Sequence, residues 1–395
     1  MLKMYFNFKD VFRAARLGFS PKKIWTFFCG LLLGLAVYNL FSYLAHAVAG
    51  RSLAETWSMF GLLPIFWPDF GGWAWLLWLI GAFSLVIIYL LAAAAVARIT
   101  AEQLSGNEFY EIKEAAGFVK MNWKAVLGAP LVIVSFIAFL VLGGVVLGLW
   151  GRIPYLGELT VSLLAVPVYL VCLFIAFLVV ALVIALVYSP VVAGAAQSDT
   201  FDNLFEIFSG MTSQPWRLVV YSGLLKMVCL AGFITFGIFT VGAMMVAFHT
   251  LGLAMGEKFV NIAIAGFNSY TPGWVVNVLI KLSGGYGPFQ FMLAVPELDR
   301  VGQVSAFFIG MSINAVRLLM LSYLMSCWVV GQTIIYGIIV MKRDQRNIFE
   351  NQGEAEAGET EAAEECPPVS EAVGRKVLKT VKKVTAVKKQ AKGRK

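Results

Sequence analysis

The stretch SGNEFYEIKEAAGFVKMNWK at residues 105–124 is polar, and a related stretch, SDTFDNLFEIFSGMTSQPWR, follows at residues 198–217. Shifted by 93 positions, the two stretches align at a glycine and at a tryptophan followed by a basic residue: Gly117 with Gly210, Trp123 with Trp216, and Lys124 with Arg217. Each stretch, here called an elbow, leads directly into a long apolar run. The elbows therefore predict that the chain repeats one structural unit.

Composition assigns the protein to a membrane. Hydrophobic residues make up 59% of the chain and charged residues 14%, whereas soluble domains are roughly half apolar. A helix needs about 20 apolar residues to cross a hydrocarbon core about 30 Å thick. Six apolar runs predict six transmembrane helices, at about residues 24–48, 73–97, 125–149, 161–188, 218–248 and 317–341.

Basic residues cluster at 1–23, 98–124 and 342–346. Because lysine and arginine are enriched in cytoplasmic loops, these clusters predict that both termini lie in the cytoplasm. Aromatic and basic residues where each elbow meets its apolar run are expected to anchor the chain at the membrane interface. These predicted anchors are Trp25, Trp123, Lys124, Trp216 and Arg217.

Each elbow also predicts a helix that lies on the cytoplasmic membrane surface. In the first, Ser105-x-x-Glu108 fits a capping box, and apolar residues recur at helical spacing, including Ala115 and Val119. In the second, Asp199 or Thr200 is the expected cap. A degenerate third copy at 1–23 predicts a basic amphipathic helix that ends near Gly18.

The predicted fold is an all-α membrane domain at 1–345, built from three tandem units of an interfacial cytoplasmic helix and a transmembrane hairpin. Units with one orientation are parallel repeats, which can pack around an axis along the membrane normal. Residues 249–316 form the longest external segment, and their short apolar runs predict interfacial or re-entrant helices. Gly144-x-x-x-Gly148 is a candidate for close helix approach.

The tail at 346–395 separates its charges into an acidic block and then a basic block, which predicts disorder. The basic block is expected to contact anionic lipid or an acidic partner. It lacks interleaved aromatic residues and a recognisable domain, so nucleic acid is an unlikely partner.

Lys226 is the only charged residue well inside a predicted span. Two interpretations stay open: its ammonium reaches back to the cytoplasmic interface, or it marks a polar site within the membrane. The sequence contains no metalloprotease, serine-hydrolase or Walker motif, and its five cysteines do not have metal-binding spacing. We therefore expect no cofactor and no enzymatic activity.

The segments AARLGFSPKKIW at 14–25 and SYLMSCWVVGQTIIYGIIVMKRD at 322–344, with the elbows, resemble a group of uncharacterised bacterial six-span membrane proteins. The resemblance covers most of residues 1–345 but not the tail. It implies an inner-membrane location, and it implies no particular activity.

These observations favour a non-enzymatic membrane scaffold, or an accessory subunit that binds the lipid bilayer and other membrane proteins. The alternative is a solute transporter or channel, for which the pseudo-repeats and the external segment argue. A lipid-modifying enzyme is a third class, and it would need a carboxylate or histidine cluster that the sequence does not reveal.

Overall fold

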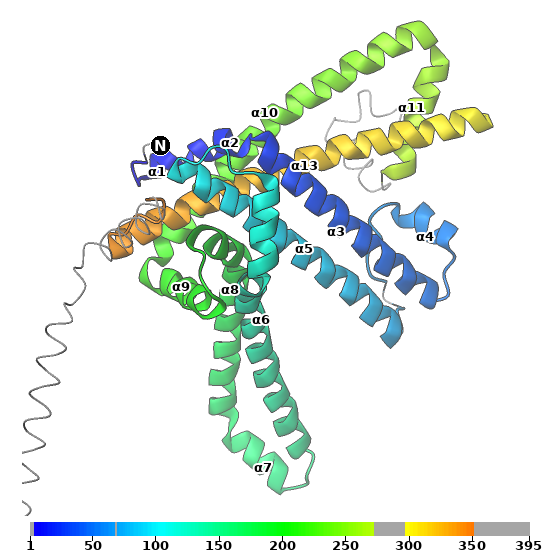
Figure 1. The fold of residues 1–395 in the computed structure, drawn as a ribbon. Helices are drawn as coiled ribbons and strands as arrows, with labels where there is room; N and C mark the ends of the chain where they lie inside the picture. Colours follow the sequence, from blue (N-terminus) through cyan, green and yellow to red (C-terminus); the bar gives the residue numbers. More distant parts are fainter. Residues whose placement is uncertain (1–3, 68, 272–296, 351–395) are drawn as a thin grey trace, which may run out of the picture. The chain divides into compact units, whose positions relative to one another are not determined.

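The computed structural model describes residues 4–67, 69–271 and 297–350, and all regular secondary structure within them is helical. Six helices are long and apolar enough to cross a membrane, which confirms six predicted spans and a multi-pass membrane protein. They are α3 (Pro21–Val48), α5 (Gly72–Ser105), α6 (Ile112–Trp150), α8 (Ala165–Ala196), α10 (Pro215–Met255) and α13 (Arg300–Asp344) (Figure 1).

Residues 1–348 form one compact unit, and all packing described below lies within it. The charged tail predicted at 346–395 falls outside the described residues from 351 onward, as does the part of the external segment at 272–296.

The external segment is more helical than the sequence predicts. Helix α10 continues to Met255, and α11 (Glu257–Tyr270) is a separate short helix. Residues 300–316 are not separate short helices, because they belong to the continuous helix α13. Asp299 explains this start, since its carboxylate accepts a hydrogen bond from Gly302 N at 2.9 Å and caps the helix.

The first elbow does not begin with the predicted capping box. Ser105 is the last residue of α5, which ends because Gly106 adopts a left-handed φ of 105°. The next helix starts after Glu111, whose backbone N–H donates to the Glu114 carboxylate at 2.9 Å. Within α6, Asn122 has non-helical angles (φ −106°, ψ 17°), so a bend separates the elbow helix from the apolar run that follows.

The second elbow forms a helix of its own, α9 (Thr200–Ser213), with Asp199 as its N-cap residue. Its most buried side chains are Asn203 and Ile207, so the face that packs inward includes a polar residue. The degenerate copy forms two short helices, α1 (Phe8–Val11) and α2 (Arg13–Gly18), in place of one.

Helix α13 is the core of the unit. In its most apolar 18-residue window 78% of residues are buried, compared with 6% in α6 and 17% in α8. It packs against helices from every part of the unit: α1, α2, α3, α5, α8, α10 and α11. Helices α3, α5, α8 and α10 therefore share one central helix. Helices α6 and α8 form a hairpin joined through α7 (Leu156–Leu163) (Figure 1), and few residues of their most apolar windows are buried.

Small residues let the helices approach one another, at positions other than the predicted ones. Helices α3 and α5 lie side by side, and a Cβ added at Gly30 or Gly34 would come within 2.8 Å of Ala92 or 2.9 Å of Leu85. This Gly-x-x-x-Gly pair therefore makes the close contact that such motifs allow. No described atom lies within 4 Å of the Cβ position at Gly144 or Gly148, so no described helix uses that candidate motif for close approach.

The glycine shared by the two elbows also has open space around it. At both Gly117 and Gly210 no described atom lies within 4 Å of an added Cβ. Tight packing is therefore not the reason for glycine at these positions.

The extended connection between α3 and α5 folds back onto α3. It contains α4 (Leu53–Phe60) and a loop whose carbonyls accept hydrogen bonds from α3 side chains: Tyr38 and Ser42 to Pro64 O, Tyr43 to Gly61 O, and His46 to Ile65 O. The ring of His46 is enclosed by Phe60 and Phe70. The His46 side chain is thus buried and holds this loop in place.

Two cysteines provide a direct test of the α10–α13 contact. Cys229 Sγ and Cys327 Sγ lie 3.1 Å apart, and both side chains are buried. A disulfide requires about 2.05 Å between the sulfurs, so a small movement suffices. We expect diamide to oxidise this pair, releasing two thiol hydrogens to the reagent, and to form an intrachain bond that mass spectrometry detects. Cys229→Ser should abolish it, and Cys172→Ser, at an exposed site, should not.

Candidate functional site

Trp25, Trp216 and Arg217 lie near the starts of α3 and α10, and Trp123 and Lys124 follow the bend at Asn122 in α6. All are exposed except Arg217, which is half-buried. Trp25, Trp123 and Trp216 keep 55%, 47% and 60% of their surface exposed, which leaves them free to meet lipid headgroups. Two are paired with the adjacent cation: Lys124 Nζ lies 6.0 Å from the Trp123 ring centroid, and Arg217 Cζ lies 5.2 Å from that of Trp216. In each elbow, the predicted tryptophan anchor thus lies beside the basic residue that follows it.

Lys226 lies on the exposed side of α10 and makes no hydrogen bond or ion pair with the described residues. It does not line either of the two small cavities described here, so the structure gives it no polar cavity within the described chain. A lysine at the centre of a transmembrane helix costs about 2.5–3.5 kcal/mol by insertion scales. An unpaired lysine in this position therefore needs an explanation.

The depth of Lys226 follows from the register of α10 against α13. The helices are antiparallel: Leu225 meets Gly331, and Cys229 meets Cys327. Between these contacts, Lys226 is level with Val330 of α13. Val330 is about 13 residues, or roughly 20 Å, from both Arg317 and Arg343. Lys226 is thus midway between the two arginines that bracket the apolar part of α13.

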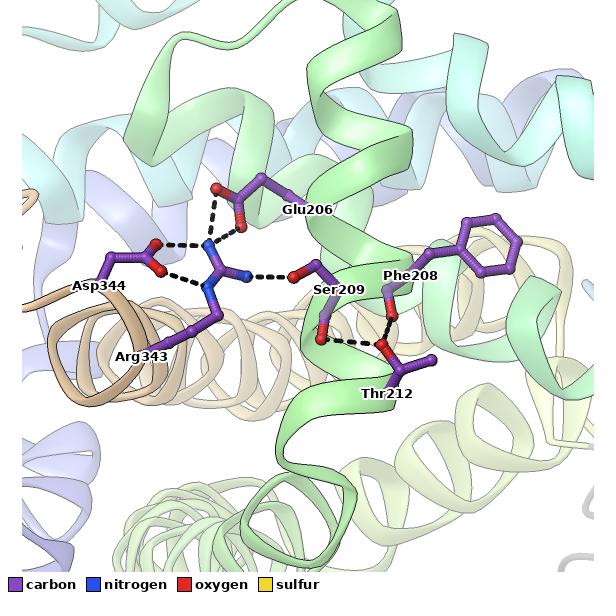
Figure 2. Close-up of polar contacts among 6 residues, drawn as sticks. All are labelled: Glu206, Phe208, Ser209, Thr212, Arg343 and Asp344. Atoms are coloured by element: carbon purple, nitrogen blue, oxygen red, sulfur yellow. Dashed lines mark hydrogen bonds and ion pairs between the residues drawn. The ribbon is translucent and has the colours of Figure 1, made fainter.

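A polar cluster joins the last turn of α13 to α9 (Figure 2). The guanidinium of Arg343 donates to both carboxylate oxygens of Glu206, at 2.8 and 3.0 Å, and to Ser209 Oγ at 3.0 Å. It also donates to the neighbouring Asp344. The side chains of Arg343 and Glu206 retain only 17% and 19% of their exposure. This arrangement uses the fork geometry of arginine to fix the second elbow against the core helix.

A small cavity lies beside this cluster. It encloses about 20 Å³ and is lined by Tyr188, Glu206, Tyr336 and Arg343 among other residues. That volume suffices for about one water molecule. Its size suits a hydrated structural contact and is far below the several hundred Å³ of a typical ligand pocket.

A second buried network attaches α9 to the hairpin of α6 and α8. Pro130 has no N–H, so the carbonyl of Val126 lacks its helical donor. Ser189 Oγ donates to that carbonyl at 2.5 Å. Asn203 Nδ2 of α9 then donates to Ala125 O at 2.8 Å and to Ser189 Oγ at 2.9 Å. A proline in a transmembrane helix thus creates the acceptor around which the elbow is anchored.

We expect Asn203→Leu to lower the free energy of unfolding by about 1–3 kcal/mol, because a buried amide with three polar contacts is lost from a network that cannot recruit bulk water. Thermal unfolding in mild detergent measures this change. Asn314→Leu is a suitable control, because that amide contacts only residues of its own helix. Equal effects of the two substitutions would show that the cross-helix network contributes nothing.

The sequence did not identify Arg343, Asn203 or Lys23 as buried contacts. Lys23, read as part of a basic cluster, is fully buried, and its Nζ donates to Leu17 O at 3.2 Å and to Gln103 Oε1 at 2.8 Å. The only sign of these contacts in the sequence was that Pro130 and Pro190 lie near the first and the second elbow. A proline leaves one helical carbonyl without its N–H donor, so that carbonyl can accept a hydrogen bond from elsewhere.

Within the described part of the chain, no group of three or more His, Cys, Asp or Glu residues has the arrangement of a metal site. Comparisons with protein-family models, with curated proteins and with solved structures find no significant match to this chain.

Proposed function

We propose that the protein is a non-enzymatic scaffold or accessory subunit of a membrane complex. The observation that carries this proposal is the contrast between α13, with 78% of its most apolar window buried, and α6, with 6%. A hairpin that contributes so little to its own core has a large apolar surface available for other transmembrane helices. Such association depends on van der Waals packing and small residues, and α6 offers Gly144 and Gly148 with open space around them.

The small cavities support this role over transport. The two described cavities enclose about 10 and 20 Å³, whereas ligand sites usually enclose about 300–1,000 Å³. In this conformation the middle of the unit is filled by α13.

We further propose that three tandem units of elbow and hairpin build the domain, in a bacterial inner membrane with both termini in the cytoplasm. The bend at Asn122 and the break between α9 and α10 at Gln214 lie at nearly equivalent positions of the two elbows, which supports the repeat. Cysteines introduced at Tyr110 and Phe205 in a cysteine-free background should label from the same side of the membrane. Labelling from opposite sides would contradict this orientation.

Photocrosslinking in native membranes tests the scaffold role. A photoreactive residue at Phe139 of α6, which is 69% exposed, should give crosslinks to defined partner proteins. Phe139→Ser combined with Leu142→Ser should release these partners without lowering the unfolding temperature of the isolated chain. Lipid adducts alone, with a monomer in every mild detergent, would refute the proposal.

A further inference from the structure

Lys226 has no partner that the described chain supplies. Ser222 lies one turn before Lys226 on α10, and its Oγ accepts a hydrogen bond from Gln332 Nε2 of α13 at 3.4 Å. Lys226 bonds to neither of them. No described residue therefore pairs with its ammonium.

The surroundings of Lys226 suit a helix. Exposed residues at helical spacing form an apolar stripe on the same side of α10: Val219, Gly223, Leu230 and Ile234. At Gly223 no described atom lies within 4 Å of an added Cβ, so a second backbone can approach close to the lysine. This stripe is called the Lys226 face below.

Retreat of the ammonium to the interface is limited by distance. Lys226 lies nine residues after Arg217, or about 13 Å along the helix. The four-carbon stem of lysine is shorter than this distance. The charge thus stays within the apolar layer in a helix that crosses it, where ionisable groups are normally paired.

We propose that the Lys226 face binds a transmembrane helix of a different protein that carries an aspartate or glutamate at mid-membrane depth. This inference rests on the proposed role as an accessory subunit and names the chemistry of one partner. The predicted spans of this chain contain no aspartate or glutamate, so a second copy supplies no carboxylate at this level. Charge complementarity selects an acidic helix of another chain.

A synthetic peptide provides a defined probe. The full-length protein is reconstituted in phosphatidylcholine vesicles, and energy transfer reports its association with a leucine-rich transmembrane peptide that has one central glutamate. A matched peptide has glutamine in place of glutamate. We expect the glutamate peptide to bind at least tenfold more tightly. Lys226→Leu should remove that preference, and Lys226→Arg should keep it.

Lys124→Leu is the matched control, because Lys124 is an exposed basic residue that follows the bend at Asn122, beside Trp123, and does not lie at mid-span. It should leave the preference unchanged. Equal binding of the two peptides, or a preference that survives Lys226→Leu, would overturn the proposal. So would a preference that disappears when phosphatidylglycerol is added, because lipid phosphate would then be the occupant, or Lys226-dependent association of two labelled copies of this chain.

The two proposals fail separately. Crosslinks from Phe139 without a glutamate preference would retain the accessory role and refute the Lys226 face. A glutamate preference that depends on Lys226, with no native crosslinks from Phe139, would refute docking on α6 and retain the charge-selective face of α10.

Discussion

Gly194→Val will lower the free energy of unfolding by about 3 kcal/mol, at the upper end of the usual cost of overpacking. A Cβ at this position of α8 would lie 2.7 Å from Ala94 O, 2.8 Å from Ala97 Cβ and 3.1 Å from Arg98 N of α5. Two of these three atoms belong to the backbone, so no side-chain rotation relieves the clash. The helices must separate, and the contacts of the alanine-rich segment of α5 are lost with them.

Gly144→Val is the control for this substitution. Both positions are glycines in apolar helices, but no described atom lies within 4 Å of the Cβ position at Gly144. Its effect on the unfolding temperature of the purified protein in mild detergent should be small. If the two valines destabilise the protein equally, the close packing of α5 and α8 is incorrect.

Arg343→Met will cost about 2 kcal/mol of stability. Removing one partner of a fully buried ion pair costs about 3–5 kcal/mol, and the residual exposure of Arg343 and Glu206 reduces this value. The cost arises mainly because Glu206 and Ser209 keep their desolvated oxygens and lose the guanidinium donor.

A double-mutant cycle with Glu206→Gln isolates the pair, and unfolding in detergent provides each stability. We expect a coupling energy of about 1 kcal/mol or more. Arg346→Met removes an exposed arginine three residues later and should be nearly neutral. A cost at Arg346 that matches the cost at Arg343 would show that net charge, and not this contact, stabilises the end of α13.

The sequence predicted the number of long helices well, because a continuous apolar run of bilayer length has few alternatives. It predicted the ends less well. Helix α5 includes Ser105 and ends there because Gly106 adopts a left-handed conformation. The sequence did not reveal this, because the Ser105-x-x-Glu108 pattern fitted the start of a new helix equally well.

The spacing of apolar residues could not predict which helices pack against one another. Hydropathy does not distinguish a lipid-facing residue from one that faces another helix, since both are apolar. Two Gly-x-x-x-Gly patterns were therefore equivalent in the sequence, and only the pair at Gly30 and Gly34 meets a neighbouring helix in the structure. Mean hydropathy did not single out the buried helix either: the most apolar windows of α3 and α13 have the same mean hydropathy, 1.8, but 22% and 78% of their residues are buried.

The same limit applies to the candidate site. Lys226 was conspicuous in the sequence as a charge within an apolar run. Whether its side chain faces another helix or the outside of the unit depends on how α10 packs against α13, which the sequence does not show. Asn203 and Arg343 were inconspicuous because polar residues in elbows and helix ends are usually solvated. Their burial follows from tertiary contacts with Pro130-containing α6 and with α13.

The position of α13 in the chain affects the order of biogenesis. Among the six long helices it leaves the ribosome last, so α3, α5, α8 and α10 enter the bilayer before their shared packing partner has been synthesised. During that interval the faces that later cover α13 are open to chaperones, to proteases and to neighbouring nascent chains. Quality control of this protein should therefore act on a late step, the insertion of its final helix.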